Sequence, residues 1–158
     1  LSLHDALPIC CMTYQPKIKQ INLQDHIFCE WRQKWVKLTP EEWVRQNMLH
    51  LLVDDYHYPK SAIAVEQAIS LGQLSKRCDA VVYDKSLKPL CIIEFKAQTV
   101  ELTQKVFDQI AVYNIKLNVN YLIVSNGQTT YSCYVNDKQV SFLNSLPTYE
   151  QLQNGKNH

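Results

Sequence analysis

The sequence lacks several features that would place the protein in a familiar class at once. It has no run of about 18 apolar residues, the length that a membrane-spanning helix needs, so we expect no membrane partner. Its net charge is only +1, which excludes an overall basic field that attracts nucleic acid. A nucleic-acid function therefore requires a local basic patch or help from a partner. None of the six cysteines forms a CxxC pair and the five histidines show no ligand spacing, so the sequence predicts no zinc site.

The composition predicts an ordinary folded domain. The chain has 158 residues, of which 46% are hydrophobic and 20% charged, enough for one domain with a sizeable core. Cys78, Cys91 and Cys133 lie in apolar, strand-like runs and are expected to be small buried residues with free thiols. We therefore expect a reducing compartment and a cytoplasmic location.

The first residues differ from the rest of the chain. The stretch "LSLHDALPI" begins without Met and has neither the basic nor the apolar region of a signal peptide. It resembles the in-frame translation of a sequencing-library adapter. We expect residues 1–11 to be a non-native segment and residues 12–158 to form a single domain.

Local patterns predict an alternation of helices and strands. Thr39 is a good N-cap, Pro40 fits the first helical position, and Glu42 is placed to close a capping box, so a helix is expected over 39–56. A second helix is expected over 102–117, capped by Thr103. The expected strands are a strand or hairpin in 27–38, an antiparallel meander at 61–69, 78–84 and 90–97, a strand at 120–127, and a hairpin at 130–135 and 139–143, before a short helix at 148–153. The order predicts a layered α/β domain, with Trp31, Trp35 and Trp43 used for packing.

The stretch "CIIEFKAQ", residues 91–98, contains the most informative residues. Side chains alternate along a strand, so Glu94 and Lys96 share one face and Phe95 faces the other way. Asp79 opens the preceding strand, and a hairpin brings it beside Glu94. Two carboxylates with a Lys suit metal-assisted phosphodiester hydrolysis: the carboxylates hold Mg²⁺, and the Lys orients water or stabilises developing charge. The alternative is an exposed Glu94–Lys96 ion pair on an edge strand, which would be weak and without function.

Asp79 and Glu94-Phe95-Lys96 resemble the signature of the PD-(D/E)XK nucleases, although Cys78 stands where the signature has Pro. Gln109 and Tyr113 resemble the QxxxY motif that follows it in some members, and their spacing puts them on one helix face. More specifically, the segments "RQKWVKLTPEEWVRQ", "YPKSAIAVE", "KRCDAVVYD", "IIEFKA", "FDQIAVYN" and "YLIVSNG" resemble the N-terminal nuclease domain of type I restriction enzyme R subunits, over about residues 27–140.

The resemblance implies a restriction-endonuclease-like α/β fold, in which a central mixed sheet is flanked by the helices from about Pro40 and about Thr103. It implies a Mg²⁺-dependent DNA endonuclease, with Mn²⁺ as a substitute. The implied metal ligands are Asp79, Glu94 and the Phe95 backbone carbonyl, and Lys96 serves the attacking water. Gln109 and Tyr113 position the motif or contact the nucleic-acid backbone. Accessory candidates are the acids Glu42 and Glu66, and the cations Lys76, Arg77 and Arg45 for phosphate.

Several alternatives stay open at this point. The chain has no GxxxxGK[ST] P-loop, so we expect no ATP-driven motor in it. The same fold could serve as a non-catalytic module that binds nucleic acid or protein, or it could cut RNA or branched DNA. The partners could include other restriction-modification subunits or a second copy of the chain, since a site of this kind cuts one strand.

Overall fold

A computed structural model of the chain describes residues 13–137 and 139–155. The segment 1–11, expected to be non-native, lies outside the described residues. The strands are β1 (Ile18–Ile21), β2 (Gln24–Cys29), β3 (Lys34–Lys37), β4 (Ile63–Leu71), β5 (Leu74–Tyr83), β6 (Pro89–Phe95), β7 (Tyr121–Ser125), β8 (Thr130–Asn136) and β9 (Gln139–Phe142). The helices are α1 (Pro40–Tyr56), a 3₁₀ turn (Lys60–Ala62), α2 (Gln104–Leu117) and α3 (Tyr149–Asn154).

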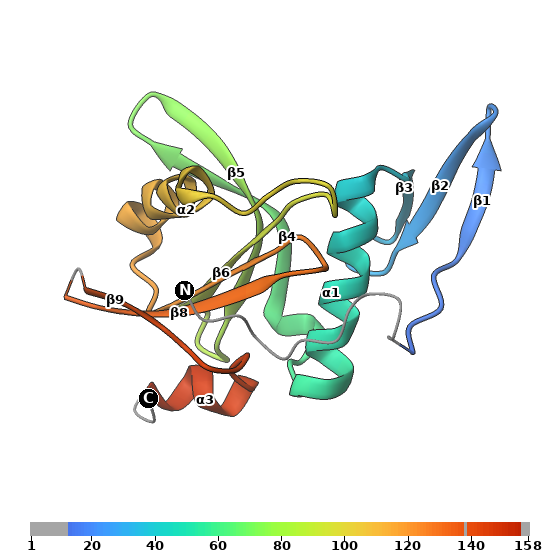
Figure 1. The fold of residues 1–158 in the computed structure, drawn as a ribbon. Coiled ribbons are helices and arrows are strands. Elements are labelled where there is room, and N and C mark those ends of the chain that lie inside the picture. Colours follow the sequence, from blue (N-terminus) through green and yellow to red (C-terminus); the bar gives the residue numbers. More distant parts are fainter. Residues whose placement is uncertain (1–12, 138, 156–158) are drawn as a thin grey trace.

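Two sheets organise the molecule. The larger has six strands in the order β4-β5-β6-β7-β8-β9, and the smaller has the order β1-β2-β3. All neighbours in the large sheet are antiparallel except β6 and β7, which α2 connects by a crossover. In Figure 1 the small sheet lies beyond α1, on the side away from the large sheet. The predicted meander, the strand after α2 and the final hairpin are confirmed.

Alternating side chains of the large sheet bury both of its faces. One core joins α1 and α3 to residues such as Ala80, Val82 and Ile93. The other joins α2 to residues such as Val81 and Ile92. Two such faces demand apolar residues in succession, which explains the continuous run "LCII" in the central strand β6. Helices therefore flank the sheet on both sides, as predicted.

The helix ends follow the sequence signals with two exceptions. Thr39 Oγ1 accepts a hydrogen bond from the Glu42 backbone N–H at 3.0 Å, so the N-cap of α1 is confirmed. The Glu42 carboxylate instead contacts Arg32 and Arg45, because pairing with buried cations outweighs a bond to the cap backbone. Thr103 occupies the N-cap position of α2, but its side chain makes no capping hydrogen bond.

Other expectations can be compared with the structure directly. Asp79 lies in the middle of β5 and does not open the strand, because the hairpin with β4 extends the strand back to Leu74. Cys78, Cys91 and Cys133 are buried free thiols, as predicted. In the described part of the chain, no helix combines the length and apolar character that a bilayer crossing requires. Trp31 and Trp43 pack against the core on the α1 side.

Ile93 provides a test of the core assignment. Its side chain is fully buried in β6, so Ile93→Ala should lower the free energy of unfolding by about 2–5 kcal/mol. Ile115 on α2 is 79% exposed, and Ile115→Ala should change stability by less than about 0.5 kcal/mol. Urea unfolding followed by circular dichroism measures both. Equal effects of the two substitutions would contradict the assignment.

Candidate active site

Strands β5 and β6 bring Asp79 and Glu94 to neighbouring positions. Ala80 pairs with Ile93, so the next residues of the two strands, Asp79 and Glu94, lie on the same face. Asp79 Oδ2 accepts a hydrogen bond of 2.7 Å from the Phe95 backbone N–H, which fixes the carboxylate at the end of β6. The structure thus brings together the two acids that the sequence singled out.

Glu94 is a buried carboxylate with incomplete compensation. Its Oε1 accepts from Gln109 Nε2 at 3.0 Å and lies 3.7 Å from Lys96 Nζ, while Oε2 is buried and has no hydrogen-bond partner. Burial, reinforced by the charge of Asp79 and opposed by Lys96, raises the pKa of Glu94 to about 8. The Glu94 side chain is 5% exposed and β6 is a central strand, so the alternative of an exposed pair on an edge strand is wrong.

Helix α2 contributes a chain of hydrogen bonds. Lys96 Nζ donates to Gln109 Oε1 at 3.3 Å, and Gln109 Nε2 lies 3.1 Å from the Tyr113 hydroxyl. The Tyr113 hydroxyl in turn donates to the Arg77 carbonyl of β5 at 2.8 Å. Since Gln109 contacts both Glu94 and Lys96, its amide fixes the relative position of the two side chains.

A second group of charges lies between α1, the small sheet and β4. Arg45 donates to Asp79 Oδ1 at 2.9 Å, and it pairs with Glu42 at 3.2 Å and Glu66 at 3.6 Å. Arg32 pairs with Glu42 and, at 3.4 Å, with Glu66. The Arg45 side chain is only 7% exposed, so the prediction that it meets phosphate is wrong in this structure: its guanidinium is occupied by carboxylates.

Glu66 has an unusual backbone. It lies inside β4 with a φ of 54°, a left-handed backbone conformation that residues other than Gly rarely adopt. The pairing of β4 with β5 is interrupted at the same place, opposite Asp79. Its carboxylate reaches the two arginines and does not point freely into solvent, although it is 37% exposed. Strain of this kind concentrates at functional sites.

Sequence reasoning missed Glu41 and Arg32. Burial, with the nearby charge of Asp79, raises the pKa of Glu41, whereas Lys96 and Arg45 oppose the shift. Glu41 therefore belongs to the electrostatic environment of the site. From the sequence alone, an acid in a first helical turn is already explained by its favourable interaction with the helix dipole. Arg32 lies in a turn between two strands, and no local pattern indicates its partner. The exposed Lys76 and Arg77 side chains, expected near phosphate, make none of these contacts.

The oxygens available to a cation can be stated from these contacts. Among the residues described, no three side chains of His, Cys, Asp or Glu converge as a metal site. Glu94 Oε2 is nevertheless a buried acceptor without a partner, next to the carboxylate of Asp79. Two carboxylates suit a hard cation that completes its shell with backbone or water oxygens. The residues fit such an ion if Asp79 Oδ1 gives up its hydrogen bond from Arg45 and binds the cation instead.

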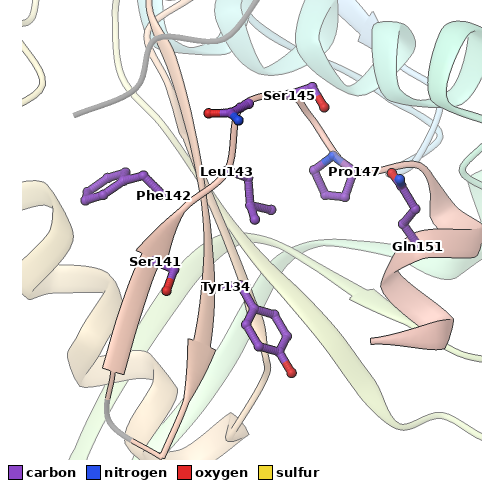
Figure 2. Close-up of a pocket in the computed structure, with 8 residues that line it drawn as sticks. Tyr134, Ser141, Phe142, Leu143, Ser145, Pro147 and Gln151 are labelled. Atoms are coloured by element: carbon purple, nitrogen blue, oxygen red, sulfur yellow. The ribbon is translucent and has the colours of Figure 1, made fainter. Parts of the chain in front are cut away.

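The surface next to these residues is hollowed. A hollow of about 560 Å³ is lined by Val36, Lys37, Thr39, Pro40, Glu41, Glu42, Arg45, Glu66 and Ala97. Figure 2 shows another pocket, of about 390 Å³, between β8, β9 and α3. That pocket is lined by Tyr134, Ser141, Phe142, Leu143, Asn144, Ser145, Pro147 and Gln151, with no carboxylate, cation, His or Cys. Of these two hollows, only the first has carboxylates and cations in its lining.

The comparisons with known proteins agree with the geometry. A family profile described as type I restriction enzyme R protein N terminus (HSDR_N) matches residues 40–147. The chain belongs to this family. No curated protein matches the chain. The resemblance found in the sequence segments is thereby confirmed, and all the predicted site residues lie inside the matched range.

Solved structures of this family and of nucleases resemble the chain. A fragment of a candidate HsdR subunit of a type I restriction enzyme from Vibrio vulnificus YJ016 has a TM-score of 0.57 and 14% identity, over 75% of this chain and 25% of that one. A candidate nuclease of the DUF820 group from Anabaena variabilis ATCC 29413 has a TM-score of 0.49 and 12% identity, over 82% and 84% of the two chains. The type IIG restriction endonuclease BpuSI has a TM-score of 0.41 and 19% identity, over 61% and 11%. The match to the Vibrio fragment confirms the predicted restriction-endonuclease-like α/β fold, and this chain spans a quarter of the Vibrio chain's length.

The raised pKa of Glu94 makes stability depend on pH. Because the folded protein holds this proton up to a pKa of about 8 and the unfolded chain releases it near 4.5, stability should fall as pH rises from about 4.5 to 8. Glu94→Gln should remove that part of the slope, since glutamine does not titrate. Thermal unfolding of both proteins in EDTA measures the difference. A parallel pH profile of the two proteins would rule out the buried carboxylate as its cause.

Arg45 should matter to the fold because four carboxylates share it, of which Glu41 is the most distant at 4.0 Å. Arg45→Met leaves Asp79 without its counter-charge and leaves Glu42 and Glu66 with Arg32 alone, so it should cost about 3–5 kcal/mol of unfolding free energy. The exposed Arg77 is a matched control, and Arg77→Met should change stability by less than about 0.5 kcal/mol. Urea unfolding at neutral pH is the measurement. A small effect of Arg45→Met would show that water compensates these carboxylates.

Proposed function

We propose that this HSDR_N protein hydrolyses phosphodiester bonds of DNA in a Mg²⁺-dependent reaction, with Mn²⁺ as a substitute. The observation that carries the proposal is the buried, unpartnered Oε2 of Glu94 beside Asp79 and Lys96. A buried polar atom without a partner is costly, and carboxylates with strongly perturbed pKa values cluster at functional sites. The family match and the restriction-endonuclease-like fold support the same reaction class.

The contacts of each residue suggest its role in the proposed reaction. Asp79, Glu94 and the Phe95 backbone carbonyl would hold the cation, which supplies a polarised phosphate and a water of lowered pKa. Lys96 retains 22% exposure of its side chain, so its ammonium can reach a water or a phosphate oxygen while it stays beside Glu94. Its positive charge would stabilise the negative charge that builds up on the phosphate oxygens.

Gln109 and Tyr113 act through the others. Gln109 holds Lys96 and Glu94 at the same time, and Tyr113 anchors Gln109 to β5 through the Arg77 carbonyl. Their proposed role is to position the ammonium and the carboxylate. Preorganisation of this kind matters because displacement of a reacting group by about 1 Å can cost 100-fold in rate.

A second candidate function has one specific observation in its favour. Arg45 donates to Asp79 Oδ1, the oxygen that a metal ion would use, and its guanidinium already supplies a positive charge there. The chain could then serve as a DNA-binding or protein-binding module without catalysis. Isothermal titration of Mg²⁺ into the protein separates the two functions: measurable binding that Glu94→Gln abolishes favours the enzyme, and no binding favours the module.

Lys96→Ala should remove cleavage while the fold remains intact. Loss of a preorganised charge at the reacting phosphate lowers such rates by about 100- to 1,000-fold. The assay compares supercoiled plasmid, linear duplex and single strands, with Mg²⁺, Mn²⁺ or EDTA. Single-strand nicks should precede linear product, because one site cuts one strand, unless a second copy or another restriction-modification subunit joins the reaction.

Lys85→Ala serves as the control, because this exposed lysine lies in the turn between β5 and β6, away from the site contacts. It should cut like the parent protein. Unchanged, metal-dependent cleavage by Lys96→Ala would sink the assignment of the site.

A further inference from the structure

The small sheet carries a cluster of lysines on one face. Lys19 and Lys37 are both paired with His26 of β2, one from each side, so these three side chains point the same way. Phe28 is paired with Trp35 two residues further along, and the Lys17 carbonyl accepts the Phe28 backbone N–H. We call this surface, consisting of Lys17, Lys19, His26, Phe28, Trp35 and Lys37, the basic face.

The opposite face of the small sheet is the one that packs inward. Ile27 and Cys29 alternate with His26 and Phe28 along β2, and both are fully buried. Asp25, the only acid within β1, β2 and β3, lies on the same face as Ile27 and Cys29 and not on the basic face. The basic face is therefore the outer face, and it carries three positive charges without an acid.

The three lysines are available for an external anion. Lys17, Lys19 and Lys37 are all exposed, and in the described part of the chain none lies within ion-pair distance of a carboxylate. By contrast, Arg32 and Arg45 are occupied by acids. A chain with a net charge of +1 thus keeps three unpaired cations together on one surface.

The aromatic rings hold the lysines in place. Lys19 Nζ lies 4.1 Å from the centroid of the Trp35 ring, and Lys17 Nζ lies 6.0 Å from that of Phe28. Phe28 and Trp35 contact each other edge to face at 5.5 Å. Rings covered in this way are poor platforms for unpaired bases, which need an open ring face to stack. The arrangement favours phosphates over bases as the ligand.

The basic face continues toward the candidate active site. Lys37 lines the hollow of about 560 Å³ together with Glu41, Glu42, Arg45 and Glu66. In Figure 1, β3 leads directly into the start of α1, whose first residues Pro40, Glu41 and Glu42 line this hollow. The carboxylates there repel a polyanion, so DNA needs a compensating surface nearby. The small sheet also precedes residue 40, where the match to the family begins.

We propose that the basic face is a docking surface for the phosphate backbone of duplex DNA, which it delivers to the hollow beside Glu41 and Glu66. Lys17, Lys19 and Lys37 each neutralise a phosphate, and Trp35 and Phe28 position the ammonium groups of Lys19 and Lys17. Binding of this kind carries no base readout and depends strongly on salt. The proposal names the substrate surface of the proposed nuclease and in that sense rests on it, but its test does not require cleavage.

The test measures binding without cutting. A fluorescent duplex is titrated with the full chain carrying Lys96→Ala, in EDTA, over a series of salt concentrations. Removal of the three lysines (K17A/K19A/K37A) should reduce the slope of log affinity against log salt by about 0.9 per phosphate lost, or up to about 2.7, and should weaken binding at least about tenfold near 0.1 M salt. The matched control, K85A/K88A/K116A, removes three exposed lysines outside the basic face and should leave the slope unchanged.

A third variant guards against a damaged fold. K17R/K19R/K37R keeps the charges and the ring contacts, so it should bind like the parent protein. The proposal is overturned if the parent binds no duplex at low salt, if both alanine triples lose the same slope, or if the K17A/K19A/K37A variant keeps it. Tighter binding of a fluorescent polyglutamate of equal charge would identify an acidic protein as the partner instead and would equally overturn it.

Cleavage assays with Lys96 restored separate this proposal from the proposed function. Duplex binding through the basic face by a chain that never cuts would sink the nuclease and leave the docking surface standing. Cutting by K17A/K19A/K37A that matches the parent at every DNA concentration would sink the docking surface alone. If both proposals hold, the triple variant should raise KM for duplex at least about tenfold, with kcat little changed.

Discussion

The buried guanidinium of Arg45 is the interaction on which the position of the site depends. It contacts Glu42 on its own helix, Glu66 on β4 and Asp79 on β5, so one side chain ties α1 to two strands of the large sheet. Three carboxylates gathered in a poorly hydrated place would repel one another, and each would lose its hydration. Arg45 and Arg32 offset that cost, and in doing so they fix where β4 lies relative to Asp79. The unusual φ of Glu66 follows from the same demand, since the strand has to turn its carboxylate toward the arginines.

Glu94 shows what happens where this internal pairing stops. It lies on the strand next to Asp79 and is as deeply buried as Arg45, yet Lys96 at 3.7 Å is its only ion-pair partner in the described part of the chain. One of its oxygens has no hydrogen-bond partner, and burial raises its pKa to about 8. The protein therefore compensates one carboxylate cluster fully and leaves a neighbouring carboxylate partly uncompensated. A fold under selection for stability alone gains nothing from that asymmetry, whereas the cation of the proposed reaction would supply the missing positive charge.

The sequence predicted those features that depend on local chemistry. Thr39 and Pro40 start α1, the apolar run before Glu94 predicts a strand covered on both faces, and the four-residue spacing of Gln109 and Tyr113 puts their side chains in contact. The partners of Arg32, and the contacts of Arg45 with Glu66 and Asp79, could not be predicted, because they join residues 10 to 34 positions apart and depend on the final packing. Glu41 was missed for a related reason: an acid in a first helical turn already has a local explanation. The family resemblance placed Asp79, Glu94 and Lys96 together, but only the structure shows that Arg45 competes for Asp79.

The distribution of charge also explains why the net value of +1 is a poor guide to partners. Arg32 and Arg45 are directed inward and are paired with acids, so they contribute little to the field outside. The lysines of the basic face are unpaired and exposed, and they lie at alternate positions of the two outer strands: Lys17 and Lys19 at the β1 edge, and Lys37 two residues after Trp35 at the β3 edge. That period of two was present in the sequence. The sequence alone does not show that the three lysines share a face. That follows from the structure, in which Ile27 and Cys29 face inward and all three lysines face outward. Whether a nearly neutral chain can hold a polyanion therefore depends on which of its cations are already paired with acids: Arg32 and Arg45 at the site are paired, whereas Lys17, Lys19 and Lys37 on the basic face are not.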